Sequence, residues 1–293
     1  LVTVNVNPLP VVTITGTNAI CAGGSTTLTA NGANSYLWST AANVNSIVVS
    51  PIANTVYSVS GASSLGCTGT AAVTTTVYSL PIVSITGTNA ICSGQSSTLI
   101  ANGANSYVWS NSANSNSIVV SPLSNTSYSV VGTNTLGCIG SSSIINLTVN
   151  PLPVVSITGT NALCVGSSVN LSAVGANTYT WNTGSNTAIL SVSPSVNTSY
   201  SLTGTSSLGC LSSNTAILAV TVNTLPIVVF TGTNAICVGA SAIITAGGAS
   251  TYSWNTGANT ASISVSPVSN TNYTATGVSA LGCLGSAVRA ITV

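Results

Sequence analysis

Cysteine is the residue type in this sequence whose spacing most clearly points to chemistry. The 293 residues include eight cysteines, but no histidine, aspartate, glutamate or lysine, and Arg289 is the only charged side chain. The cysteines occur in two settings: a first cysteine ends the phrase TGTNAIC or a near copy, and a second ends the phrase LGC. The first cysteines are Cys21, Cys92, Cys164 and Cys237, and the second cysteines are Cys67, Cys138, Cys210 and Cys283.

The constant spacing predicts disulfides. Each second cysteine follows a first cysteine by 46 residues, which favours four bonds inside successive repeats: Cys21–Cys67, Cys92–Cys138, Cys164–Cys210 and Cys237–Cys283. Closing a loop of this length stabilises a small domain by about 4 kcal/mol on the chain-entropy model. Disulfides imply an oxidising compartment outside the cytoplasm. The alternative is a metal held by cysteines alone, which two cysteines per repeat without histidine favour less.

The missing side chains exclude most other chemistry. General acid–base catalysis uses groups that titrate near neutral pH, and a serine or threonine nucleophile needs a base to activate it. Calcium and magnesium sites are built mainly on carboxylates, and nucleic-acid binding relies on several lysines and arginines. With none of these groups except Arg289, we expect no enzyme, no cofactor, no metal site and no nucleic-acid partner.

The chain is apolar in composition, yet it does not read as a membrane protein. Mean hydropathy is +0.60, but serine and threonine interrupt every apolar run before it reaches the ~18–20 residues of a spanning helix. We therefore predict no transmembrane segment. The high value reflects missing charge.

Aromatic residues keep the same register as the cysteines. One tryptophan lies 17 residues after each first cysteine, and one tyrosine lies ten residues before each second cysteine. We assign these side chains to the core between two sheets, with exposed tryptophans stacking on sugars as the alternative for the tryptophans. The residues are Trp38, Trp109, Trp181 and Trp254, and Tyr57, Tyr128, Tyr200 and Tyr273.

The elements that position these residues are predicted to be short β-strands. Segments such as NSIVVSP and TAILSVSP alternate apolar and polar residues, which is the strand period, and turn phrases such as NGAN and SSLGC separate them. We predict an all-β protein of four tandem Ig-like or PKD-like β-sandwiches in a rod-like array, with one disulfide in each. The predicted boundaries are 1–7 for an orphan last strand, then 8–78, 79–149, 150–222 and 223–293 for repeats 1 to 4.

The pattern C-x-G, Y-x-W, SP, T-x-Y and LGC resembles the Ig-like and PKD-like repeats of giant surface proteins in gliding bacteria that use type IX secretion. The resemblance covers the whole chain four times and implies a spacer or adhesive stalk outside the cell. Relatives usually carry acidic residues after the tryptophan, where this chain has Ser39, Ser110, Asn182 and Asn255. We therefore do not predict cation binding for this chain from the resemblance.

The opening phrase LVTVNVNPLPVV matches the joints between repeats, such as INLTVNPLPVV. It reads as the last strand of a preceding repeat. We consider two explanations: the sequence is a window on a longer tandem array, or the strand docks into another subunit. The proline in each joint restricts the backbone and stiffens the connection.

Net charge near zero promotes association, and this chain has no lysine with which to protect its sheet edges. Two hypotheses follow: the repeats associate with one another into a filament, or glycans supply solubility. Asn125 and Asn197 begin N-T-S triplets that match the glycosylation sequon.

The sequence thus predicts a structural, non-catalytic protein at the cell surface, the shaft of a filament or adhesin. The alternative is an array of modules that bind carbohydrate or another surface through aromatic or Thr/Asn-rich faces.

Overall fold

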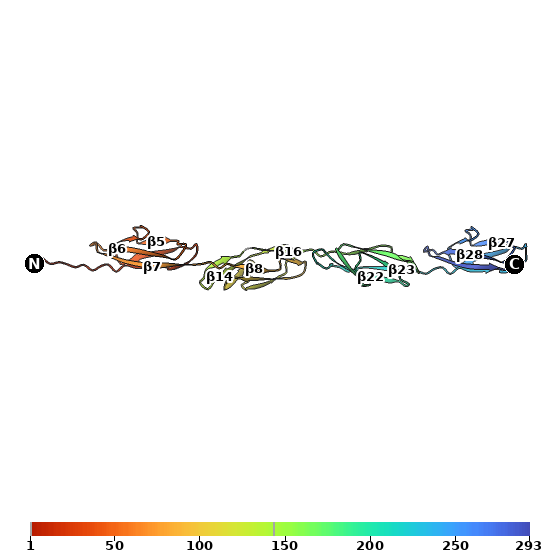
Figure 1. Cartoon of the computed structure of the whole chain (residues 1–293), viewed down its shortest axis with the longest axis horizontal. Coiled ribbons are helices and arrows are strands. Elements are labelled where there is room, and N and C mark those ends of the chain that lie inside the picture. Colours follow the sequence, from red (N-terminus) through yellow and green to blue (C-terminus); the bar gives the residue numbers. More distant parts are fainter. Residues whose placement is uncertain (1, 143) are drawn as a thin grey trace. The chain divides into compact units, whose positions relative to one another are not determined.

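The protein is described by a computed structural model that covers residues 2–142 and 144–293. These residues form two compact units, Leu1–Asn150 (unit 1) and Pro151–Val293 (unit 2). Figure 1 shows strands joined by turns in both units, and the described residues contain no helix. Accordingly, none of the described segments is a helix long and apolar enough to cross a membrane.

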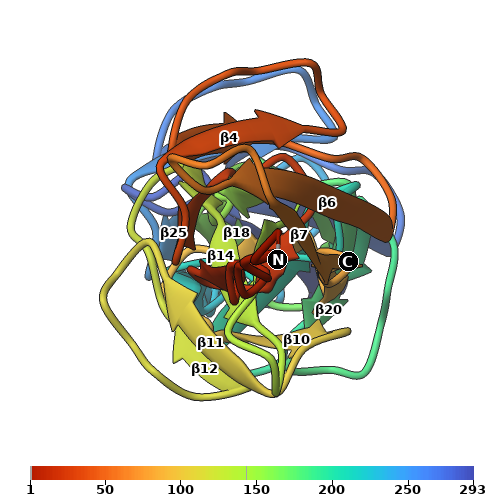
Figure 2. The ribbon, with the colours of Figure 1, turned by 90° about the vertical axis from the view of Figure 1, so that its left-hand side faces the viewer.

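The first half of unit 1 is a sandwich of two sheets. One sheet has the order β1-β3-β5 and the other the order β2-β7-β6-β4. Figure 2 shows β4, β6 and β7 of the larger sheet. The strands are β1 (Thr13–Thr15), β2 (Ala19–Cys21), β3 (Thr26–Asn31), β4 (Ser35–Trp38), β5 (Ser46–Val49), β6 (Thr55–Ala62) and β7 (Thr68–Tyr78).

The second half of unit 1 repeats this plan with interruptions. The smaller sheet is β8-β10-β12, and the larger one is divided into β11-β14-β15 and β13-β16-β9. The strands are β8 (Ser84–Gly87), β9 (Ala90–Cys92), β10 (Ser97–Asn102), β11 (Ser106–Trp109), β12 (Ser117–Val120), β13 (Thr126–Tyr128), β14 (Val130–Thr133), β15 (Ile139–Ser141) and β16 (Ile145–Asn150).

Unit 2 contains two sandwiches of this kind, and in the second an isolated bridge between Ala235 and Thr292 stands in place of the short strand that ends at the first cysteine. The sheets are β17-β19-β21 with β18-β23-β22-β20, then β24-β25-β27 with β26-β28-β29. The strands are β17 (Ser156–Thr158), β18 (Ala162–Cys164), β19 (Val169–Val174), β20 (Thr178–Trp181), β21 (Ile189–Val192), β22 (Thr198–Thr205), β23 (Ala216–Asn223), β24 (Val229–Gly232), β25 (Ala242–Gly247), β26 (Thr251–Trp254), β27 (Ser262–Val265), β28 (Thr271–Val278) and β29 (Leu284–Ile291).

Alternation of side chains explains why these segments form half-buried strands. In β3 and β10 every second residue is buried, and Leu28 and Leu99 are fully covered. A strand directs successive side chains to opposite faces, so one face packs against the facing sheet while serine, threonine and asparagine remain on the other. The all-β sandwich predicted from the alternation is confirmed.

Four separate clusters of buried apolar residues form the cores. Each lies within one of the predicted repeats, and each contains one tryptophan, for example Trp38 with Leu28 and Trp181 with Leu171. The chain divides between Asn150 and Pro151 into the two compact units, and each unit contains two of these clusters. The boundaries 8–78, 79–149, 150–222 and 223–293 stay a prediction.

The segment expected to be an orphan strand pairs with no strand among the residues that the structure describes. Residues 2–7 form no strand and are exposed, while residue 1 lies outside the described residues. A strand is stabilised by hydrogen bonds to a neighbouring strand. With none available here, the alternating valines Val2, Val4 and Val6 remain exposed.

Candidate functional site

The four tryptophans lie inside the cores. They are between 2% and 5% exposed, and each indole Nε1–H donates to the carbonyl oxygen six residues later. The Trp38 bond to Val44 measures 2.9 Å, and the other three measure 2.8 Å. A buried ring with its polar atom satisfied cannot stack on a sugar, so the aromatic-platform alternative is wrong for these residues.

The tyrosines contribute to the same interior. Tyr57, Tyr128, Tyr200 and Tyr273 are all buried in the clusters. The tyrosine two residues before each tryptophan plays a different part, because its hydroxyl closes a turn. In the first sandwich, the Tyr36 hydroxyl donates to the Ala33 carbonyl at 2.9 Å and accepts from the Ala33 amide at 3.0 Å.

The disulfide pairing differs from the sequence prediction. Cys21 bonds to Cys138, with a Cα–Cα distance of 5.5 Å, and Cys164 bonds to Cys283, with a Cα–Cα distance of 5.6 Å. Each bond joins the first cysteine of one predicted repeat to the second cysteine of the next. The predicted pairs Cys21–Cys67, Cys92–Cys138, Cys164–Cys210 and Cys237–Cys283 are therefore wrong, and so is one disulfide inside each domain.

Of the other four cysteines, two are disulfide-bonded and two are free thiols. Cys92 and Cys210 are disulfide-bonded as well. Cys67, which is half-buried, and Cys237, which is exposed, are free thiols in the described part of the chain.

The two cysteines of one sandwich cannot meet because they lie at opposite ends of it. Cys21 lies beside Tyr78, the last residue of β7, in a parallel pair of strands. Cys67 directly precedes Thr68, the first residue of the same strand. At ~3.3 Å per residue, the 11 residues of β7 separate the two ends by roughly 35 Å, far beyond the span of a disulfide.

The second cysteine is presented by a compact turn, which we call the LGC turn (residues 63–67, 134–138, 206–210 and 279–283). In the third of these, the Ser206 amide donates to the Cys210 carbonyl at 2.8 Å, and the Ser206 hydroxyl accepts from the Cys210 amide at 3.1 Å. The glycine before the cysteine has a φ of +79° here, in the left-handed region that glycine tolerates. The turn therefore fixes the backbone at the second cysteine, directly before the strand that follows it.

A disulfide, a linker and two turns together form what we call a joint. In unit 1 the joint includes a bond of 3.3 Å from the Asn134 side-chain amide to the Ser79 carbonyl. In unit 2 a shallow pocket of about 360 Å³ lies at the joint. It is lined by Cys164, Val165, Gly166, Ser167, Leu225, Gly282 and Leu284. Linker, first cysteine and LGC turn thus meet at one place.

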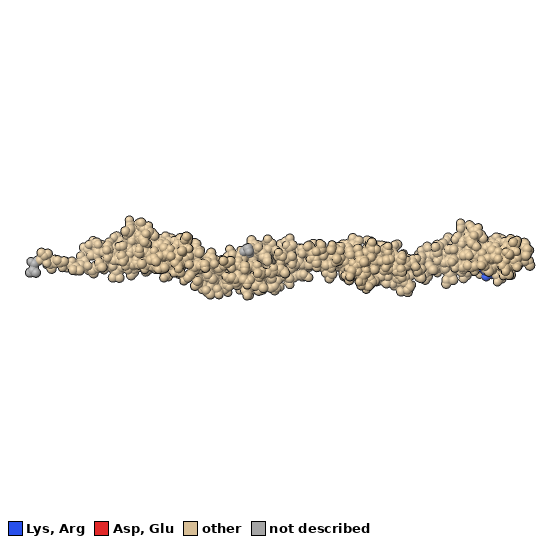
Figure 3. All heavy atoms as spheres, viewed as in Figure 1, with Lys and Arg blue, Asp and Glu red and all other residues tan. Residues whose placement is uncertain are grey.

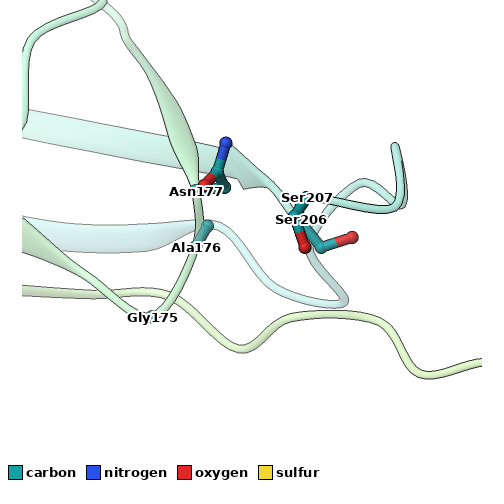
Figure 4. Close-up of a pocket in the computed structure, with 5 residues that line it drawn as sticks. All are labelled: Gly175, Ala176, Asn177, Ser206 and Ser207. Atoms are coloured by element: carbon teal, nitrogen blue, oxygen red, sulfur yellow. The ribbon is translucent and has the colours of Figure 1, made fainter.

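Chemistry elsewhere on the molecule is sparse. The blue atoms of Figure 3 belong to Arg289, whose guanidinium donates to the Gly232 carbonyl at 2.8 Å. The described residues contain no cluster of three or more metal-binding side chains. A pocket of about 370 Å³ in unit 2 is an open hollow between two loops, lined by Gly175, Ala176, Asn177, Ser206 and Ser207 (Figure 4). None of these five side chains carries a charge.

The two sequon asparagines have a structural role that the sequence reasoning missed. The Asn125 side-chain oxygen accepts from the Val149 amide, and that of Asn197 accepts from the Val222 amide, both at 2.8 Å. Asn54 makes the equivalent bond to Val77. The asparagine ties a loop to the last strand of its sandwich, and its recurrence in an A-N-T, S-N-T or V-N-T phrase was the available signal.

Comparison with known proteins assigns no family. The sequence matches no family model and no curated protein. Similar solved structures include a Ca²⁺-stabilized adhesin with which an Antarctic bacterium binds ice, 11% identical over 96% of this chain and 98% of that one, with a TM-score of 0.39. A 1.5-MDa bacterial ice-binding adhesin is 13% identical over 74% of this chain and 99% of that one, with a TM-score of 0.32. Fibronectin(III)-like modules of Clostridium thermocellum CbhA are 8% identical over 47% of this chain and 94% of that one, with a TM-score of 0.27. These neighbours are bacterial adhesin and fibronectin-like β-sandwich modules, and none of them assigns a function to this chain.

Proposed function

We propose that the protein is a structural, non-catalytic component of an extracellular surface filament or adhesin shaft. The observation that carries the proposal is the pairing of cysteines across joints, Cys21 with Cys138 and Cys164 with Cys283. A disulfide inside one sandwich would stabilise that sandwich alone. A disulfide between two sandwiches joins them covalently at a second point besides the linker, so tension passes between them without unfolding the sandwich.

The compartment follows from the same bonds. Structural disulfides persist mainly in oxidising surroundings, which supports a location outside the cytoplasm, at the cell surface. The scarcity of titratable side chains supports a role without catalysis. The finer proposal is a tandem-repeat protein of the PKD-like kind that gliding bacteria export by type IX secretion, and it rests on the phrase pattern alone.

The near absence of charge supports self-association as part of this role. Apolar side chains such as Ile52, Ile82 and Leu123 are exposed. Two molecules that meet through such side chains experience almost no charge repulsion, because Arg289 is the only charged side chain. Glycans at exposed hydroxyls or asparagines remain the alternative source of solubility, because the amide nitrogens of Asn125 and Asn197 take no part in the bonds to the last strand.

Stretching single molecules by their two ends, before and after treatment with a thiol reductant, tests the proposal. We expect the oxidised chain to stop at a short contour length, because the residues enclosed by each disulfide cannot extend. The reduced chain should extend further and unfold in additional steps.

The matched control is a Cys67→Ser variant, which removes a thiol without removing a bond of the structure. It should extend like the unmodified chain in both conditions. Equal contour lengths for the oxidised and reduced chains would show that the disulfides do not carry force, and the shaft proposal would fail.

A further inference from the structure

The pairing of the joint cysteines is not the pairing that an unfolded chain favours. Cys21 bonds to Cys138 across a separation of 117 residues, although Cys67 lies only 46 residues from Cys21. The free energy of closing a loop in a flexible chain rises with the logarithm of its length, so the shorter loop closes roughly four times more often. The bond between Cys164 and Cys283 likewise encloses two other cysteines. Chain statistics alone therefore favour bonds between cysteines that are nearer in the sequence.

Folding reverses this preference. Once β7 has formed, its length keeps Cys67 away from Cys21. The neighbouring sandwich instead brings Cys138 to a Cα–Cα distance of 5.5 Å from Cys21, which is a usual separation in a disulfide. The order of events therefore decides which bond forms. Oxidation before folding favours the nearer pairs, and oxidation after folding produces the bond of the joint.

The sandwiches have the interactions they need to fold before any disulfide forms. None of the four core clusters, as the described residues form them, contains a cysteine. The LGC turn also has the same shape with and without a bond. The Ser63 amide donates to the carbonyl of Cys67, a free thiol, at 2.9 Å, and the Ser279 amide donates to the carbonyl of the bonded Cys283 at 2.8 Å. The second cysteine is therefore in position before it reacts.

The two cysteines of a joint differ in exposure. Cys138 and Cys283 are fully buried, whereas Cys21 and Cys164 are half-buried. Cys164 also lines the shallow pocket at the joint of unit 2, beside the apolar side chain of Leu225. A reagent in solution therefore reaches the first cysteine of a joint more readily than the second.

We propose that each joint closes last, when a small-molecule disulfide oxidises sandwiches that have already folded. Cys21 and Cys164 are the entry thiols, which react with the oxidant, and Cys138 and Cys283 are the resolving thiols, which displace it. Before this step the linker is the only covalent connection between the two sandwiches of a unit, so oxidation converts a hinge into a locked joint. The inference goes beyond the proposed function, because it concerns how the bonds form and holds whether or not they carry force.

The exchange balances with oxidised glutathione as the oxidant. The Cys164 thiolate attacks one sulfur of oxidised glutathione, forms a mixed disulfide and releases one glutathione thiolate. The Cys283 thiolate then attacks the Cys164 sulfur, forms the joint disulfide and releases the second glutathione thiolate. Two protein thiols lose two protons and become one disulfide, while the oxidant is reduced to two thiols.

Oxidation of the chain in two states tests the order of events. The unmodified chain is fully reduced and then treated with oxidised glutathione, either in native buffer or in urea. Tryptophan fluorescence reports folding before the oxidant is added, and peptide mapping with a protease that cleaves after aromatic residues identifies the bonds. We expect Cys21–Cys138 and Cys164–Cys283 from native buffer, and mainly nearer pairs such as Cys21–Cys67 from urea.

Two results would overturn this order. Exposed tryptophans in the reduced chain in native buffer would show that the sandwiches need their disulfides to fold. Bonds of the joint as the main product in urea would show that the pairing does not need the fold.

A matched pair of variants tests the roles of the two thiols. Both carry Cys67→Ser and Cys237→Ser, and one adds Cys283→Ser whereas the other adds Cys164→Ser, so neither can form the bond of unit 2. Each is reduced, allowed to fold and treated with oxidised glutathione, and mass spectrometry of its peptides follows the adducts. We expect Cys164 to acquire glutathione, and Cys283 of the other variant to react at least about tenfold more slowly because it is buried.

Reaction of both variants in urea is the control, and there the two thiols should react at similar rates. Equal rates for Cys164 and Cys283 in the folded chains would overturn the assignment of entry and resolving thiols. Neither experiment bears on the stretching measurement, which starts from bonds that have already formed.

Discussion

Units 1 and 2 have the same joint but differ inside their sandwiches. The enclosed separations are 117 residues for Cys21–Cys138 and 119 residues for Cys164–Cys283, and the bonded Cα atoms are equally far apart within 0.1 Å. Inside, by contrast, unit 1 has a buried threonine where unit 2 has an aliphatic residue, and two turns without glycine where unit 2 has glycine. The joint is thus built alike in both units, whereas packing and turn residues vary.

Removal of a disulfide should have the largest effect on stability, and the effect should be the same in each unit. Replacing both cysteines of a joint by serine, at Cys21 and Cys138 or at Cys164 and Cys283, should lower the free energy of unfolding of that unit by about 4–5 kcal/mol. The similar loop lengths make the two losses equal. Urea unfolding of the oxidised chains, followed by tryptophan fluorescence, measures them, and a loss confined to one unit would contradict the equivalence.

The buried threonine should produce the next largest effect, with opposite signs in the two units. Thr75 is fully buried and its hydroxyl finds no hydrogen-bond partner among the described residues. It lies opposite Thr55, as Val220 lies opposite Thr198. Thr75→Val should raise the free energy of unfolding by about 1–3 kcal/mol, and Val220→Thr should lower it by a similar amount, because an unsatisfied buried hydroxyl is costly.

Denaturant midpoints of these two variants provide the measurement. The exposed Thr74→Val change, one residue away on the other face of β7, is the matched control and should leave the midpoint unchanged. A stabilisation by Thr74→Val as large as that by Thr75→Val would show that strand propensity, and not the buried hydroxyl, is responsible.

The turn after each tryptophan should produce a smaller difference. Ala41 and Ser112 have φ values of 66° and 67°, while Gly184 and Gly257 have 82° and 85° in the equivalent turns. Side chains are disfavoured in this left-handed region, but glycine loses more entropy on folding. Ala41→Gly should therefore stabilise its sandwich by about 0.5–1 kcal/mol, and Gly184→Ala should destabilise its own by about as much.

Thermal unfolding of single and paired substitutions measures this turn effect. If Ala41→Gly lowered the melting temperature, then the entropy of the unfolded chain would outweigh the backbone strain, and the comparison between the units would be reversed.

Changes in pH should have the smallest effect, and the two units should respond alike. Stability depends on pH only through groups that bind different numbers of protons in the folded and unfolded states, and no side chain of this sequence titrates as a carboxylate or an imidazole. The free energy of unfolding should change by less than about 0.5 kcal/mol between about pH 3 and pH 7. Denaturant unfolding across this range checks it, and a cooperative acid transition in either unit would contradict it.

Much of the interior could be predicted from the sequence because its causes are local. Ile47 and Val49 alternate with polar residues, and both are buried in β5. The tryptophans and tyrosines recur at fixed distances from the cysteines, and all eight aromatic residues predicted to be buried lie in the cores. A period of two residues and an aromatic side chain in each repeat suffice for such predictions, whatever the arrangement of the strands.

The candidate site could be predicted only in part. The sequence identified the eight cysteines, yet a spacing that repeats every 71–73 residues fits pairing within a repeat as well as pairing between neighbours. Nor did the sequence show that Thr75 occupies a core position or that Asn125 ties a loop to the last strand, because both depend on which strand lies opposite.

The sequence by itself determined the strands, the core aromatic residues, the near absence of charge and the number of cysteines, since these follow from composition and short-range alternation. Only the tertiary structure decided which cysteines bond. The first cysteine lies beside the end of the last strand, in parallel pairing, and the second precedes the start of that strand. The length of one strand therefore separates the two, and each reaches a partner only across a joint.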